Sequence, residues 1–96
     1  MMDYVLSPRA QADIDEIWDY SADRWDVDQA TRYIAQIRQA IEVVARDPRR
    51  GRSCDEIRRG YRRFSVGSHV PFFRIVGGQI DVVRVLHQSV DFELHL

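Results

Sequence analysis

The sequence predicts an α+β domain in which an antiparallel pair of helices packs on a small antiparallel sheet. Two segments with apolar residues at helical spacing occupy residues 8 to 47. Three segments rich in β-branched and aromatic residues follow between residues 57 and 87, separated by the tight-turn dipeptides Gly67-Ser68 and Gly77-Gly78. With 96 residues, the chain is long enough for a single domain, residues 1–96, and too short for two.

The chain opens with a short apolar run, Tyr4-Val5-Leu6, which we interpret as a strand. Ser7 can cap a first helix, and the fixed φ of Pro8 suits the first helical position. Apolar residues then recur at spacings of three and four, which gives the helix one apolar face and an acidic opposite face. This predicted face consists of Ile14, Ile17, Trp18, Ala22 and Trp25.

A second helix follows after a short connection, with Asp26 or Asp28 as its N-cap and Asp47-Pro48 as its end. Helices joined by so few residues should lie antiparallel, and neither can bury its apolar side without a sheet. The predicted apolar face of the second helix consists of Ala30, Tyr33, Ile34, Ile37, Ile41 and Val44.

The predicted strands are residues 57–66, 69–76 and 79–87, and the two tight turns set their register. This register places Arg62 and Val82 opposite Phe73, and Arg74 opposite Asp81. It also places Arg84 on the face of Phe73 and His87 on the opposite face. Pro71 has no N–H to donate in the middle strand, so a bulge there would shift part of the register.

Both faces of this predicted sheet are rich in large apolar residues, whereas a sheet with one solvated face should alternate. One helical hairpin can cover one face. We therefore expect the other face to be an apolar patch edged with arginine, which is typical of a protein-binding site. Two alternatives stay open: the helices could curl round the sheet edge, or the chain's tail could fold back over this face.

The composition narrows the classes of partner. The net charge of −1 predicts neither specific nucleic-acid binding nor a membrane partner, and no apolar stretch is long enough to span a bilayer. The start of the chain does not resemble a signal peptide, so we expect a cytoplasmic protein. No metal-ligand spacing and no Gly-rich phosphate loop occurs, so we expect no metal and no cofactor.

The distribution of charge is uneven, because eight of the eighteen residues from 46 to 63 are arginine. All fourteen basic residues of the chain are arginine, which suits interface contacts but could also reflect a GC-rich genome. Arginine and aromatic side chains are frequent anchors of protein interfaces. On this chemistry we predict partner contacts for five residues: Trp18, Arg62, Arg63, Phe73 and Arg84.

Several runs, in order and over nearly the whole chain, resemble the ParE toxins of the RelE/ParE superfamily of type II toxin–antitoxin systems. The resemblance implies a toxin that inhibits DNA gyrase and is held inactive, as a hetero-oligomer, by a ParD-type antitoxin with a ribbon-helix-helix DNA-binding end. The runs that carry it are Leu6-Ser7-Pro8-Arg9-Ala10, Arg59-Gly60-Tyr61-Arg62-Arg63-Phe64, Gly67-Ser68-His69-Val70, Phe72-Phe73-Arg74-Ile75 and Val83-Arg84-Val85-Leu86-His87-Gln88-Ser89-Val90-Asp91.

Two other functions remain as alternatives. A RelE-like ribosome-dependent mRNA endoribonuclease would need an acid, a base and cations at the scissile phosphate. Arg62, Arg84 and His87 could supply part of this set, but lysine is absent and the predicted register separates Arg84 from His87. We therefore expect no enzyme activity and no catalytic residue, and we interpret His87 as a structural residue or, alternatively, a general base. An inactive protein-binding adaptor is the third possibility.

Overall fold

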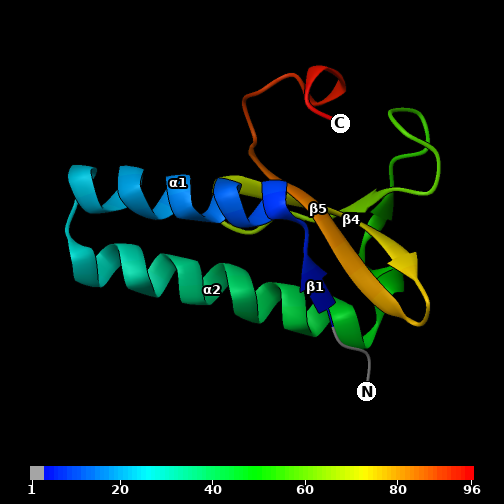
Figure 1. Cartoon of the computed structure of the whole chain (residues 1–96), viewed down its shortest axis with the longest axis horizontal. Helices are drawn as coiled ribbons and strands as arrows, with labels where there is room; N and C mark the ends of the chain where they lie inside the picture. Colours follow the sequence, from blue (N-terminus) through cyan, green and yellow to red (C-terminus); the bar gives the residue numbers. More distant parts are fainter. Residues whose placement is uncertain (1–3) are drawn as a thin grey trace.

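The computed structural model describes residues 4–96, in which a layer of two helices packs on a five-stranded sheet (Figure 1). Helix α1 (Pro8–Arg24) begins at Ser7, whose Oγ accepts a hydrogen bond from the Ala10 N–H at 3.0 Å. Helix α2 (Val27–Arg46) begins at Asp26, whose carboxylate accepts from the Gln29 N–H at 2.7 Å. Both predicted helices and their caps are confirmed.

The sheet contains β1 (Tyr4–Leu6), β2 (Arg52–Ser53), β3 (Arg62–Arg63), β4 (His69–Val76) and β5 (Gln79–His87), in the order β1-β5-β4-β3-β2. Strand β1 pairs parallel with β5 and the other pairs are antiparallel, so the sheet is mixed. Two short 3₁₀ helices, η1 (Pro48–Arg50) and η2 (Phe92–Leu94), complete the elements.

The predicted strand over residues 57–66 is wrong for most of its length, because only Arg62–Arg63 is extended and paired as β3. The preceding residues form turns. The Asp55 carboxylate accepts a hydrogen bond from the Gly60 N–H at 2.8 Å, and Gly60 has a φ of 84°. This local bond and the left-handed glycine favour a turn over the extended chain that the β-branched and aromatic residues suggested.

Strands β4 and β5 contain a bulge, which changes which side chains share a face. Near the Gly77-Gly78 turn the register is as predicted, with Phe73 opposite Val82 and Arg74 opposite Asp81. One residue further from the turn, Phe72 lies opposite Arg84 and not opposite Val83. Val83 is therefore an extra residue of β5. The predicted register is therefore wrong after this point, as a bulge near Pro71 would cause.

The bulge brings His87 to the helix-covered side of the sheet, opposite His69 instead of on the face of Phe72. The main core lies on this side, between the sheet and the apolar faces of α1 and α2. Its largest fully buried side chains are Phe73, Ile37, Ile41, Ile80 and Val82.

The second sheet face is not open, which corrects the expectation of an exposed apolar patch. Phe72 and Val70 are buried there with Cys54 and Leu86. The C-terminal segment folds back over them, and the Phe92 ring meets the Phe72 ring edge-on at a centroid distance of 4.9 Å. Burial of this second apolar face therefore comes from the chain's own tail, which Figure 1 shows returning beside the sheet. Within residues 4–96, neither helix is long and apolar enough to cross a membrane.

Candidate partner-binding groove

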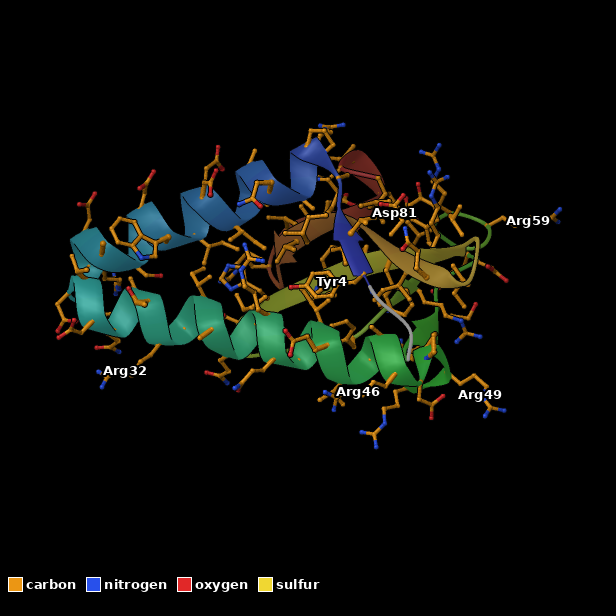
Figure 2. The ribbon with its side chains drawn as sticks, turned by 60° about the horizontal axis from the view of Figure 1, so that its bottom comes forward. Tyr4, Arg32, Arg46, Arg49, Arg59 and Asp81 are labelled. Atoms are coloured by element: carbon orange, nitrogen blue, oxygen red, sulfur yellow. The ribbon has the colours of Figure 1, made fainter. Side chains whose placement is uncertain are left out.

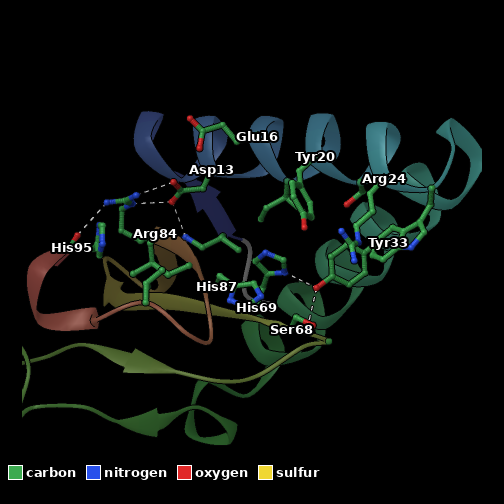
Figure 3. Close-up of a pocket in the computed structure, with 17 residues that line it drawn as sticks. Asp13, Glu16, Tyr20, Arg24, Tyr33, Ser68, His69, Arg84, His87 and His95 are labelled. Carbon is green, nitrogen blue, oxygen red and sulfur yellow. Dashed lines mark hydrogen bonds and ion pairs between the residues drawn. The ribbon is translucent and has the colours of Figure 1, made fainter.

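A groove of about 590 Å³ lies between α1, the first turns of α2 and the ends of β4 and β5 where His69 pairs with His87. We call it the hairpin groove (Figure 3). It exists because the connection between the two helices projects beyond the sheet, as Figure 1 shows, so the last turns of α1 have no strand beneath them. Its apolar lining includes Ile17, Val85, Leu86 and Val90.

Two aromatic side chains that line the hairpin groove are exposed to solvent. Tyr20 is 62% exposed and Trp25 is 52% exposed. Trp25 follows the last residue of α1 and Tyr20 lies one turn earlier. Large apolar side chains left this exposed beside a groove favour a protein contact, because burying them on a partner would remove a large apolar area from water.

An ion pair between Asp13 and Arg84 forms one wall of the groove. The Arg84 guanidinium donates two hydrogen bonds of 2.8 Å to the two carboxylate oxygens of Asp13 (Figure 3). Asp13 also accepts from the Val85 N–H at 2.9 Å, and Arg84 donates to the His95 carbonyl at 3.1 Å. The pKa of Arg84 is raised, first by its hydrogen bonds to Asp13. This pair ties α1 to β5 just past the bulge.

The other wall holds two histidines and a tyrosine. The Ser68 N–H donates to the Tyr33 hydroxyl at 3.1 Å, and this hydroxyl lies 2.5 Å from Nδ1 of His69. The hydroxyl donates to His69 when the neutral ring carries its proton on Nε2, and accepts from it in the other tautomer. The His87 ring stands edge-on to the His69 ring at 5.3 Å. The pKa of His69 is lowered, first by burial and then by the nearby His87.

In the structure, the predicted contact residues lie on different parts of the molecule. Arg84 lines the hairpin groove, and so does His87, whose Nδ1 bonds the Ser89 hydroxyl at 2.7 Å. Trp18 is half-buried between the helices, with its Nε1 at 3.4 Å from the Thr31 hydroxyl. Phe73 is 0% exposed, so the prediction that it contacts a partner is wrong.

Arg62 and Arg63 lie away from the hairpin groove. The Arg62 guanidinium donates to the Gly51 carbonyl at 2.6 Å. The Arg63 guanidinium stacks over the Phe92 ring, 5.4 Å from its centroid, on the tail-covered face. The predicted set therefore does not form one site, because strand pairing and the returning tail direct its members to different faces.

Several residues of the groove were not predicted from the sequence, although the helical spacing indicates one of them. Asp13 lies three residues after Ala10 and four before Ile17, which are both buried, so helical spacing places it on the inward side of α1. A carboxylate at such a position needs a partner. Tyr20, Tyr33 and His69 had no such signal as groove residues. Within residues 4–96, no group of three or more His, Cys, Asp or Glu side chains could hold a metal ion.

Comparison with known proteins identifies the family. The model of the family described as ParE toxin of type II toxin-antitoxin system, parDE, matches residues 4–92. The chain belongs to the ParE toxin family. Two curated relatives agree: Toxin ParE1 of Mycobacterium tuberculosis (strain H37Rv) is 56% identical over 94 residues, covering 97% of this chain and 96% of the relative. Toxin ParE1 of Caulobacter vibrioides is 47% identical over 96 residues, covering 100% and 99%.

A solved structure supports the fold of this ParE family member. The structure described as the chromosomal ParDE TA system from P. aeruginosa matches with a TM-score of 0.79, covering 91% of this chain and 96% of that one. Its sequence is only 20% identical, so the likeness bears on the fold alone. The α+β arrangement predicted from the sequence and the resemblance to ParE toxins are both confirmed.

In this ParE toxin we expect His69 to make stability depend on pH. Its pKa lies below the ordinary value of 6.5 because burial disfavours the charged ring. The unfolded chain therefore takes up a proton at a higher pH than the folded chain, so the stabilisation present above pH 6.5 is lost as the pH falls below it. Between about pH 7.5 and about pH 5.5, the melting temperature of the wild type should drop by more than that of His69→Gln.

The matched control for this pH effect is His95→Gln, which also removes one histidine but from an exposed position. It should keep the wild-type drop in melting temperature. An equal drop in the wild type and in His69→Gln would show that His69 does not couple folding to protonation.

Proposed function

We propose that this ParE toxin inhibits DNA gyrase in the cytoplasm and is neutralised in a hetero-oligomer by a ParD-type antitoxin that occupies the hairpin groove. Family membership supports the toxin class, and the ParDE description of the P. aeruginosa structure supports an antitoxin partner. The observation that carries the location is the groove itself, whose lining includes the exposed Tyr20 and Trp25 and the apolar Ile17 and Leu86.

The shape of the hairpin groove suits a helical segment of the antitoxin. An amphipathic helix places apolar anchors at intervals of three and four residues along one side, which a groove between helices and a sheet can receive. Its polar side would face the ionisable rim, where Glu16 and Arg24 lie. A fully buried aromatic anchor in such a groove contributes more to binding than the polar contacts around it.

A nuclease is the second candidate, because Arg84, His87 and His69 line the same groove. Yet two of these groups already have partners within the chain. Arg84 is neutralised by two bonds to Asp13, and Nδ1 of His69 faces the Tyr33 hydroxyl. Stabilising a phosphorane-like transition state calls for cations free to face the developing charge. We therefore favour action by binding a protein target over catalysis.

The decisive experiment uses the purified chain in two assays, gyrase supercoiling with DNA cleavage, and ribosome-dependent mRNA cleavage. Inhibited supercoiling or trapped DNA breaks, reversed by the ParD-type antitoxin, is the expected result. Cleaved mRNA without an effect on gyrase would overturn the proposal in favour of the nuclease. No effect in either assay, with antitoxin still bound, would indicate an inactive binding protein.

Removing the exposed aromatic rings should weaken antitoxin binding without loss of stability. We expect the double variant Tyr20→Ala/Trp25→Ala to raise the dissociation constant by at least about thirtyfold, which corresponds to a hot spot of about 2 kcal/mol. Isothermal titration calorimetry with the ParD-type antitoxin measures this.

The control for antitoxin binding is Val43→Ala, which removes a large apolar side chain that is 41% exposed on α2 outside the groove. Its dissociation constant should match the wild type. Equal losses in both variants, or none in the double variant, would place the antitoxin elsewhere.

A further inference from the structure

A second hollow on the opposite side of the sheet concentrates positive charge. It has a volume of about 480 Å³, and we call it the arginine groove. Three arginines line it, from η1, β2 and β3, together with neutral polar and apolar side chains. Its lining residues are Arg50, Arg52, Arg63, Phe64, Ser65, Val70, Gln88 and Phe92.

The pairing of β2 with β3 sets Arg52 directly opposite Arg63. Like charges in this position repel and destabilise the strand pair, so local stability does not explain the arrangement. Within residues 4–96, none of the three arginines of the groove forms an ion pair with a carboxylate. Such a local conflict without a neutralising carboxylate is typical of a functional site.

The backbone under these arginines is held firmly. Gly51, between Arg50 and Arg52, is buried, and a Cβ added to it would lie 2.5 Å from the ring of Phe73. The Arg62 guanidinium also bonds the Gly51 carbonyl at 2.6 Å. Arg63 is oriented by its stack on Phe92. A fixed backbone and an oriented guanidinium reduce the entropy that an anionic ligand must overcome on binding.

The electrostatic surroundings favour an anion as well. Residues 46 to 63 contain eight arginines and three acidic residues, so this end of the molecule is positive although the whole chain has a net charge of −1. Figure 2 shows Arg46, Arg49 and Arg59 at this end and Arg32 towards the opposite end of α2. Such a field raises the local concentration of a polyanion and the rate at which it binds.

The lining of the groove favours carboxylates over single-stranded nucleic acid. Single-stranded nucleic acid binds by stacking its bases on free aromatic faces. Here the Phe92 ring already carries the Arg63 guanidinium, and Phe64 packs against the core beside Phe73 at a centroid distance of 6.1 Å. Guanidinium forks bind carboxylates in a bidentate manner, and Ser65 and Gln88 could bond a peptide backbone.

From these observations we propose that the arginine groove is a docking site for an acidic, extended segment of a partner protein, separate from the hairpin groove. Its carboxylates are bound by the two opposed arginines, Arg52 and Arg63, and by the adjacent Arg50. The like-charge repulsion between β2 and β3 is relieved when the segment is bound. This proposal does not depend on the gyrase or antitoxin assignment.

The test measures fluorescence anisotropy of labelled octaglutamate with the full chain at low ionic strength and at about 0.15 M salt. We expect salt-sensitive binding that weakens about tenfold or more in Arg52→Gln/Arg63→Gln. A second variant, Arg50→Gln/Arg52→Gln, changes two exposed side chains and should weaken binding while leaving the fold intact. The matched control is Arg32→Gln, an exposed arginine outside the groove, which should bind as the wild type does.

Three results would overturn the proposal. The first is octaglutamate binding that is absent, or equally weakened in Arg32→Gln. The second is tighter binding of a labelled DNA oligonucleotide, single- or double-stranded, with the same dependence on Arg50 and Arg52, which would make the groove a nucleic-acid site. The third is salt-sensitive self-association lost in the variants, measured by sedimentation velocity, which would assign the groove to a second copy of the chain.

Discussion

Replacing Asp13 by alanine should cost about 3–5 kcal/mol of folding free energy, because it leaves the Arg84 guanidinium buried without its counter-ion. The two side chains are 11% and 14% exposed, so water screens the pair only weakly. The change also removes the acceptor for the Val85 N–H. In a domain of 96 residues the melting temperature should fall by more than about 10 °C, as measured by thermal denaturation followed by circular dichroism.

Two further variants test whether the lost ion pair causes this destabilisation. In Asp13→Leu/Arg84→Met no charge is left buried, so much of the lost stability should return. Asp13→Asn keeps an acceptor for the Val85 N–H and should lie between the wild type and Asp13→Ala. A loss below about 1 kcal/mol in Asp13→Ala would mean that the pair behaves like one on the surface, contrary to its burial.

Truncation of Phe73 should be comparably severe. The ring is 0% exposed and lies opposite both Arg62 of β3 and Val82 of β5, at the centre of the sheet. Phe73→Ala leaves a cavity in the main core and should cost about 3–5 kcal/mol, a large share of the roughly 5–15 kcal/mol that stabilises a typical domain. Urea denaturation at equilibrium measures the difference.

Gly51 provides a sharp control for the packing of Phe73. A methyl group at residue 51 would lie 2.5 Å from the Phe73 ring, so Gly51→Ala alone should cost about 1–3 kcal/mol. In the Phe73→Ala background the same methyl group would enter the cavity, and its cost should largely disappear. Additive losses in the double variant would contradict direct contact between the ring and this turn.

Much of the fold was predictable because its signals are local. The caps Ser7 and Asp26 each accept a hydrogen bond from an N–H group three residues further along the chain, and Pro48 marks the end of α2. Gly77 and Gly78 have positive φ values of 57° and 80°, as a type I′ hairpin turn requires. The register next to that turn followed directly, since two residues of fixed geometry leave the strands one way to pair.

The candidate site was much less predictable. Arg84 was named as a contact residue, yet its partner Asp13 is 71 residues away in the chain. His87 was placed on the wrong face because one extra residue in β5 reverses the direction of each side chain after it. Phe73 and Arg63 have the composition of interface anchors, but residue type alone cannot tell a buried ring from an exposed one.

The sequence by itself determined the order of the elements, the ends of the helices, the tight turns and the likeness to ParE toxins, because these depend on residues close together or on runs compared one at a time. Only the tertiary structure decided the bulge at Val83, the return of Phe92 over the second face and the two grooves. Each of these depends on which distant surfaces bury each other, and that follows from the balance of packing over the whole chain.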